Sequence, residues 1–226
     1  MQEQYTHTQT STRGLGINTV LRNTYILLSA TLAFSAVTCG IAMAMDLGRG
    51  TSLIMMLAAL ALIWFVLPRT ANSEKGLVVV FAFTGLLGAS LGPTLNHYLA
   101  MSNGSQIVLQ ALGGTAVVFF ALSGYVLTTR RDFSFMRGFL ITGLVVILLA
   151  MVGALVAGLM GANIGGFQLA ISAAVVFLMS GFILYDTSRI INGGETNYIY
   201  ATTALYLDIY NLFVHLLVLL GVMNDD

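Results

Sequence analysis

Charged residues are scarce in this sequence, and their scarcity indicates which class of protein it is. Asp, Glu, Lys and Arg make up 8% of the 226 residues, whereas a soluble domain carries about 25%. Hydrophobic residues make up 58%. A globular core of this size cannot bury that much apolar surface and still present a polar face to water. The composition therefore excludes an ordinary soluble domain and predicts a polytopic membrane protein.

Cysteine and enzyme signatures are scarce as well. The single cysteine, Cys39, lies in an apolar run without a disulfide partner or neighbours for a metal site, so we interpret it as a buried apolar residue. The formal net charge is zero, which gives no electrostatic footprint for nucleic acid. The sequence has no Walker or HExxH motif. We therefore expect no enzyme and no bound cofactor.

Seven apolar segments follow a polar N-terminal stretch, and each is near the roughly 20 residues that a helix needs to span a bilayer. The predicted spans lie at about 23–45, 51–67, 77–99, 106–128, 138–160, 165–187 and 201–221. Met1 to Val20 is polar, lacks the apolar region of a signal peptide and is predicted to be a flexible tail. The predicted fold is an all-α integral membrane protein: a seven-transmembrane-helix bundle, residues 21–226, behind the tail 1–20.

The two prolines predict where helices are interrupted. Pro68 is expected to end the second span. Pro93 removes a backbone hydrogen bond inside the third segment, beside Gly88 and Gly92, so a kink or break is expected there. The two glycines form a GxxxG pattern, which favours close helix packing within the chain. Pairing between two copies is the less favoured alternative, and the oligomeric state is left open.

Basic residues predict the orientation in the membrane. All but Arg49 of those near the spans fall on one side, and cytoplasmic loops carry the Lys/Arg excess. The N-terminus is therefore predicted to be cytoplasmic and the C-terminus periplasmic. The residues on the predicted inner side are Arg13, Arg22, Arg69, Lys75, Arg130, Arg131, Arg137 and Arg189.

Two acids interrupt the last two apolar segments. Asp186 ends the sixth, and Asp208 lies about two turns, or roughly 11 Å, into the seventh. An ionised Asp at the centre of a membrane helix costs roughly 2.5–3.5 kcal/mol. The hairpin between them is short enough to make the two helices antiparallel neighbours. The two carboxyl groups can therefore face each other across a shared interior.

A polar stripe continues along the seventh segment. Asp208, Asn211 and His215 stand at i, i+3 and i+7, which places them on one helical face. A polar stripe in a membrane helix should face the bundle rather than lipid. We interpret His215 mainly as a hydrogen-bonded packing residue and only secondarily as a proton relay. The candidate supporting residues around the two acids are Tyr185, Tyr206, Tyr210 and Arg189.

The chemistry of the acid pair leaves alternatives open. Two carboxylates a few ångströms apart cannot both ionise cheaply, so they would share a proton and act as a pH-sensing, ion-gating pair. Deprotonated, Asp186 and Asp208 form a hard oxygen site that would attract calcium weakly and transiently. In the alternative, Asp186 is satisfied by interfacial water or Arg189, and Asp208 by a tyrosine hydroxyl. An intramembrane aspartyl protease is disfavoured, because its flanking motifs are only half present at Tyr185.

Several stretches resemble one family. Residues 83–96, reading FTGLLGASLGPTLN, and residues 111–120, reading ALGGTAVVFF, resemble the signature of the Bax inhibitor-1 family. Residues 184–221 resemble the end of the family's chains. The start of the first span, VLRNTYILLSATLAFSAVT, and the GGETNYI hairpin look most like the proteobacterial, YccA-like branch. The resemblance covers essentially everything from Leu21 onward.

The resemblance implies a seven-helix bundle with the last helix central, in the bacterial inner membrane. It implies the membrane AAA protease FtsH as the partner, modulated through a cytoplasmic tail such as Met1–Val20, with the lipid bilayer as surroundings. Other bacterial members are described as pH-sensitive calcium leak channels gated by two aspartates, which Asp186 and Asp208 match. Those channels carry an arginine within the second helix, and residues 51–67 contain no basic residue. FtsH modulation is therefore the favoured function, and the leak channel is the alternative.

Overall fold

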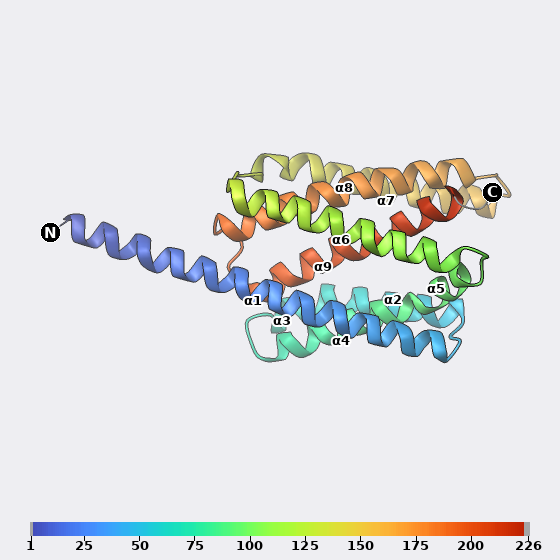
Figure 1. The fold of residues 1–226 in the computed structure, drawn as a ribbon, viewed down its shortest axis with the longest axis horizontal. Coiled ribbons are helices and arrows are strands. Elements are labelled where there is room, and N and C mark those ends of the chain that lie inside the picture. Colours follow the sequence, from blue (N-terminus) through green and yellow to red (C-terminus); the bar gives the residue numbers. More distant parts are fainter. Residues whose placement is uncertain (1, 224–226) are drawn as a thin grey trace. The chain divides into compact units, whose positions relative to one another are not determined.

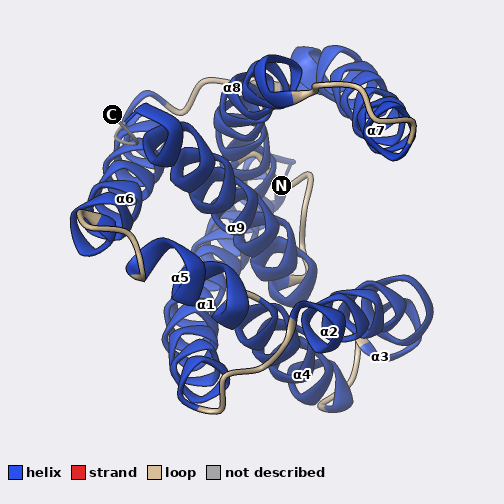
Figure 2. Cartoon of the chain, turned by 90° about the vertical axis from the view of Figure 1, so that its right-hand side faces the viewer, coloured by secondary structure: helices blue, strands red, loops and turns tan. Residues whose placement is uncertain are grey.

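The computed structural model describes residues 2–223, and its regular elements in that range are all helices (Figure 2). Within that range seven helical segments are long and apolar enough to cross a membrane. They are Gly16–Ala44, Arg49–Thr70, Lys75–Leu99, Gly104–Thr129, Ser134–Leu159, Gly165–Ile191 and Tyr198–Met223. The prediction of an all-α protein with seven spans is confirmed. The orientation of the termini and the central place of the last helix stay predictions.

The contacts of the chain divide it into two compact units. Unit 1 contains the chain up to Asn96 together with Arg189–Tyr206. Unit 2 contains His97–Ser188 together with the chain from Leu207 onward. The last helix, α9 (Tyr198–Met223), therefore contributes residues to both units. The two units are described separately below.

Unit 1 begins with α1 (Gln2–Ala44), which extends further than the first predicted span. The helix runs through most of the stretch predicted as a flexible tail, while the part apolar enough to span begins at Gly16. That stretch contains no proline, so nothing stops a helix that the membrane span has already nucleated. The flexibility of residues 1–20 stays a prediction. The availability of this stretch to a partner stays a prediction.

The second span does not end at Pro68 as the sequence predicted. It consists of α2 (Arg49–Ala61), the π-helical turn η1 (Leu62–Val66) and α3 (Leu67–Thr70). The Leu67 N–H bonds to the Leu62 carbonyl, five residues earlier. A proline ring inside a helix clashes with the carbonyl four residues before it, and a wider turn relieves that clash. The helix therefore passes the proline with a local bulge.

The third span is interrupted where Pro93 predicted a break. One residue, Leu91, separates α4 (Lys75–Ser90) from α5 (Gly92–Leu99). Helix α4 lies along α1 (Figure 1), and its glycines permit the approach. A Cβ atom on Gly88 would overlap the Ser35 carbonyl oxygen, and one on Gly92 would lie 2.8 Å from the Ala42 Cβ. The GxxxG pattern is thus used for packing inside the chain.

Unit 2 is built from α6 (Gly104–Thr129), the short 3-10 turn η2 (Ser134–Met136), α7 (Arg137–Leu159), α8 (Gly165–Ile191) and the second part of α9. Helix α7 buries only Leu140, Ile147 and Ala154, which recur every seventh residue. This narrow stripe packs on α8, where a Cβ on Gly181 would lie 2.7 Å from Leu140. Most of the rest of α7 is apolar and exposed, as expected of a helix that faces lipid.

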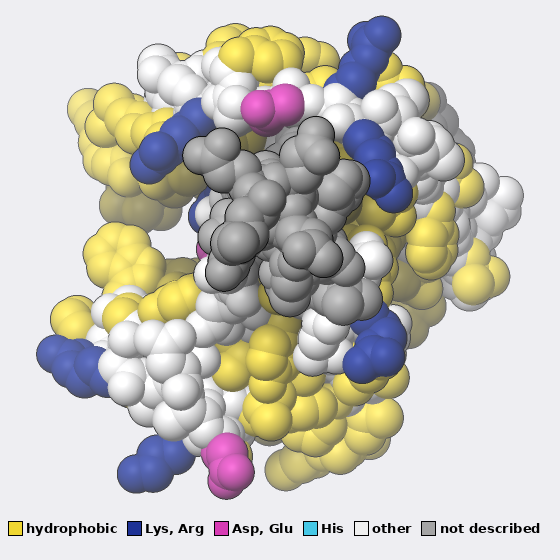
Figure 3. Space-filling view, turned by 90° about the vertical axis from the view of Figure 1, so that its left-hand side faces the viewer, with side chains coloured by type: hydrophobic (Ala, Val, Ile, Leu, Met, Phe, Trp, Pro, Cys, Tyr) yellow, Lys and Arg dark blue, Asp and Glu magenta, His cyan; other side chains and the backbone are white. Residues whose placement is uncertain are grey.

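Hydrophobic side chains also cover much of the visible surface. Figure 3 shows Lys and Arg side chains on one end of the molecule, among many hydrophobic ones. Trp64 is 74% exposed and Leu149 is 67% exposed. Exposed apolar area of this extent is incompatible with a water-facing surface and fits a protein surrounded by acyl chains.

Candidate functional site

The two acids singled out by the sequence meet in unit 2. The side chain of Asp208, on α9, hydrogen-bonds that of Asp186, near the end of α8. Both are buried, with 5% and 8% of their surface exposed. Ionised carboxylates are acceptors only, so a hydrogen bond between two of them requires a proton on one. The predicted meeting of the two carboxyl groups is what the geometry shows, and sharing a proton is the chemistry that this geometry permits.

One oxygen of the pair has no partner. Asp208 Oδ2 is buried and makes no hydrogen bond to any of residues 2–223. A buried polar atom without a partner costs about 1–3 kcal/mol. Such an atom is a place where a water molecule, a proton or a cation would be bound favourably. Asp208 has a hydrogen bond with Asp186, and the alternative in which a tyrosine hydroxyl also satisfies Asp208 stays a prediction.

The residues that follow Asp186 fix the end of α8 within unit 2. Thr187 Oγ1 lies 3.2 Å from Ser123 Oγ of α6, and both are buried. The Ser188 hydroxyl accepts from the Phe133 N–H at 2.9 Å and donates to the Arg131 carbonyl at 3.3 Å. These contacts tie the turn after α6 to the helix that carries Asp186. The sequence analysis did not identify them, although three adjacent polar residues in an apolar helix are a visible signal.

The other members of the predicted polar stripe are used for packing. His215 Nδ1 lies 3.1 Å from the hydroxyl of Ser172 on α8, which is buried. The Asn211 amide donates to the Leu207 carbonyl of its own helix at 2.8 Å. His215 therefore has the hydrogen-bonded packing environment that was preferred for it. Tyr185 and Tyr210 are half-buried on α8 and α9.

Tyr206 lies in unit 1, where its hydroxyl connects three helices. Its oxygen lies 2.6 Å from Ser35 Oγ on α1 and donates to the Thr84 carbonyl on α4 at 3.2 Å. Because the phenol has one proton, the Ser35 hydroxyl is then the donor to Tyr206. The ring is 1% exposed and packs edge-to-face on Phe83 at 5.5 Å. The sequence analysis proposed Tyr206 as a neighbour of the acids and did not foresee this network.

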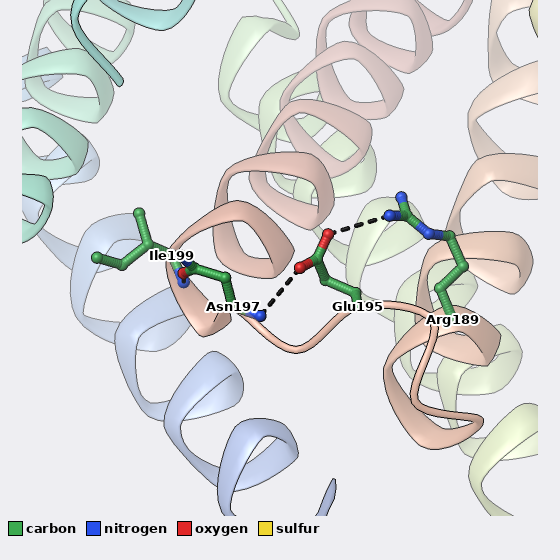
Figure 4. A network of polar contacts seen from close by, with 4 residues as sticks. All are labelled: Arg189, Glu195, Asn197 and Ile199. Carbon is green, nitrogen blue, oxygen red and sulfur yellow. Dashed lines mark hydrogen bonds and ion pairs between the residues drawn. The ribbon is translucent and has the colours of Figure 1, made fainter. Parts of the chain in front are cut away.

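The hairpin between α8 and α9 is held by its own polar contacts in unit 1. Figure 4 shows Glu195 between two partners: it accepts from Arg189 Nη2 at 3.0 Å and from the Asn197 N–H at 2.9 Å. Asn197 caps α9 by accepting from the Ile199 N–H, and its amide donates to the Ala71 carbonyl at 3.0 Å. Arg189 forms an ion pair with Glu195, and its contact with Asp186 stays a prediction.

Metal ligands are few around the acid pair. Among residues 2–223 no group of three or more His, Cys, Asp or Glu side chains is placed to hold a metal ion. Asp186 and Asp208 could offer carboxylate oxygens to a cation, and calcium prefers six to eight oxygen ligands. Any cation would therefore keep much of its water. Weak, transient calcium contact stays a prediction.

One pattern that the sequence analysis passed over is excluded as a nucleophile by the fold. Residues 88–92 read GASLG, a GxSxG pattern, which marks a serine nucleophile only on a turn from a strand to a helix. Here Ser90 is the last residue of α4 and donates to the Leu87 carbonyl at 2.7 Å. The glycines serve the packing on α1.

Comparisons with known proteins place the chain among membrane proteins. A family model described as "Inhibitor of apoptosis-promoting Bax1" matches residues 17–225. The "Modulator of FtsH protease YccA" of Escherichia coli (strain K12) is 48% identical over 212 residues, 94% of each chain. The "Inner membrane protein YccA" of Escherichia coli O6:H1 shows the same identity and coverage. An "Uncharacterized membrane protein" of Vibrio cholerae is 48% identical over 222 residues, 98% of this chain and 97% of the relative.

Proposed function

This chain belongs to the Bax inhibitor-1 family, and from that premise we propose that it binds the membrane protease FtsH and restrains its degradation of membrane substrates. The observation that carries the proposal is 48% identity over 94% of both chains to a protein named as a modulator of that protease. A match of this extent leaves little of either chain outside it. The proposed location is the bacterial inner membrane, as the name of a second relative says of that relative.

The proposed contact lies on the cytoplasmic side of the predicted topology. That side would present the start of α1, before the span that begins at Gly16. It would also present the hairpin held by Glu195 and Asn197. A helical extension beyond the membrane and a rigid hairpin next to the headgroups are surfaces that a protease with soluble domains can reach.

Copurification tests the binding directly. Full-length tagged protein is crosslinked in membranes that contain FtsH, solubilised and captured, and FtsH is detected in the eluate. A variant lacking residues 2–15 is the matched control, since it keeps the whole candidate span from Gly16. The proposal expects FtsH with the full-length chain and at least tenfold less with the shortened one. Absence of FtsH from the full-length capture overturns the proposal.

A degradation assay tests the direction of the effect. A membrane substrate of FtsH is followed over time in vesicles with and without this protein at equal amounts of protease. The proposal expects slower loss of the substrate when the protein is present. Unchanged or faster loss overturns inhibition, even if the two proteins copurify.

A second candidate function, a pH-sensitive cation leak, is supported by one observation. Two buried carboxyl groups hydrogen-bond each other, and one of their oxygens has no partner within residues 2–223. Such a pair changes its charge with proton concentration, and burial makes that change costly. Against this candidate stands the second span, where residues 51–67 contain no basic residue to neutralise the ionised pair.

Calcium flux into liposomes distinguishes the two candidates. The wild-type protein is compared with the double variant Asp186→Asn/Asp208→Asn, which keeps the size and hydrogen-bonding groups of the pair, from mildly acidic to mildly alkaline buffer. A pH-dependent flux that the double variant loses supports the leak. Flux no greater than that of empty liposomes removes the leak and leaves the acids as buried structure.

A further inference from the structure

An open-sided apolar groove runs along unit 1 between α1, α2 and α4. Its volume is about 580 Å³, and its walls include Ile41 of α1, Met45 in the turn after α1, Met55 of α2, and Ala82, Gly85 and Ala89 of α4. The three α4 residues are small and lie on one helical face. Phe34 of α1 packs against Gly85, and the small side chains of Ala82 and Ala89 contribute to the open wall of the groove.

The walls of the groove are fixed by contacts inside unit 1. The Ser52 hydroxyl on α2 donates to the Ser90 carbonyl on α4. The Asn96 amide donates to the Met43 carbonyl at 3.1 Å, which holds the end of α1. At the opposite end of the groove Phe34 and Phe81 meet edge-to-face at 5.5 Å. A pocket with fixed walls binds a ligand without first ordering its own side chains.

The dimensions fit one acyl chain. The groove extends along α1 from Phe34 to Ala42 and reaches Met45 in the following turn, which is roughly 15 Å at about 1.5 Å per residue. That length is about half of the roughly 30 Å hydrocarbon core, the depth of one leaflet. A transmembrane helix, about 10 Å across with its side chains, is too wide for this volume. Ile41 and Met45 are 54% and 65% exposed, so the groove opens toward the bilayer.

Two opposite charges flank one residue of the groove wall in the sequence. Leu47, which lines it, lies in the short turn between α1 and α2, between Asp46 and Arg49. Both charged residues are exposed, and neither forms an ion pair with another residue in the described part of the chain. Arg49 presents a fork of donors that suits a phosphate, and Asp46 accepts hydrogen bonds from an ammonium group.

We infer that this groove is a binding site for one phospholipid of the surrounding bilayer, with an acyl chain between α1, α2 and α4, the phosphate on Arg49 and a primary ammonium headgroup, as in phosphatidylethanolamine, on Asp46. Each element of the site matches one part of that lipid: an apolar slot one leaflet deep, a cation for the phosphate and an anion for the ammonium group. A choline headgroup has no N–H to donate to Asp46, and a glycerol headgroup has no positive charge. The site therefore discriminates among headgroups as well as holding a chain.

Native mass spectrometry of the full-length protein tests the site. The protein is titrated in detergent with phosphatidylethanolamine, phosphatidylcholine or phosphatidylglycerol carrying identical acyl chains, and retained lipid is counted. We expect one phosphatidylethanolamine to be retained at least tenfold more strongly than either other lipid. Similar retention of all three, or preference for phosphatidylglycerol, overturns the inference.

Two pairs of variants separate the slot from the headgroup contacts. Ala82→Phe fills the slot and is expected to reduce retention at least tenfold, whereas Val78→Phe, on the same helix and 70% exposed outside the groove, is expected to leave it unchanged. Asp46→Asn is expected to abolish the preference for phosphatidylethanolamine over phosphatidylcholine, with Asp132→Asn as its control. Equal behaviour within either pair overturns the inference. Asp46 and Asp132 are exposed, so this second pair carries the test even if Ala82→Phe does not fold.

Discussion

Asp186 of α8 and Asp208 of α9 are buried, and their side chains hydrogen-bond each other within unit 2. The contact joins the helices on either side of the last hairpin through a pair of groups that need a shared proton to bond at all. The helices are thus linked by an interaction whose strength depends on protonation. This relationship is the reason for the first prediction.

Removal of one acid should destabilise the protein more than its replacement by an amide. Asp208→Ala leaves the buried Asp186 carboxyl without its partner, and we expect a loss of about 1–3 kcal/mol in the free energy of unfolding. Asp208→Asn keeps a hydrogen-bonding group and should lose less. Denaturant unfolding in detergent micelles measures both. Asn211→Ala is the control, because the Asn211 amide bonds only the carbonyl four residues earlier on its own helix. Equal stability of the two Asp208 variants would contradict the prediction.

Substitution of Gly88 should disrupt the contact between α1 and α4. A Cβ atom there would overlap the Ser35 carbonyl and lie 2.6 Å from Thr38 Oγ1. Overpacking of this kind typically costs roughly 1–3 kcal/mol, so Gly88→Ala should lower the thermal unfolding temperature. Gly40→Ala on α1 is the matched control, since a Cβ there meets nothing within 4 Å. That variant should be neutral or slightly stabilising, because alanine favours helix. A tolerated Gly88→Ala would show that the two helices can separate at little cost.

Loss of the Tyr206 hydroxyl should loosen unit 1. Tyr206→Phe removes the bond to the buried Ser35 hydroxyl on α1 and the additional bond to the Thr84 carbonyl on α4. We expect a loss of about 1–3 kcal/mol in the free energy of unfolding and faster amide hydrogen exchange in α1 and α4. Tyr125→Phe, at a position 42% exposed, should change neither. If both variants exchange at the wild-type rate, the buried hydroxyl network does not stabilise the unit.

The hairpin should depend on Asn197 far more than on the ion pair beside it. Asn197→Ala removes the cap of α9 and the bonds to Ala71 and Asn72, and caps alone contribute about 0.5–2 kcal/mol. The Arg189–Glu195 pair spans 3.0 Å with side chains 35% and 17% exposed, and pairs this accessible contribute at most about 1 kcal/mol. Limited proteolysis should therefore cut the hairpin faster in Asn197→Ala than in Glu195→Gln. The reverse order would show that the charge pair holds the hairpin.

Much of the architecture was predictable because it depends on local properties of the chain. Segment length and hydropathy predicted seven spans, and Pro93 predicted the interruption between α4 and α5. The prediction that the second span ends at Pro68 was wrong, because a proline ring that ends a helix in water can be accommodated by one π-helical turn. The local sequence gives a segment its secondary-structure preference, and packing against the surrounding helices can override that preference.

The sequence by itself determined that this is a seven-span, all-helical membrane protein and that two acids lie in its last two spans, since charge scarcity and hydropathy are properties of the chain alone. Only the tertiary structure decided that Asp208 bonds Asp186, that Tyr206 reaches Ser35, 171 residues away, and that an apolar groove lies between α1, α2 and α4. The physical reason is that a hydropathy pattern fixes which residues enter the membrane. Which of them meet is fixed by how closely the helix surfaces pack, and that depends on residues far apart in the chain.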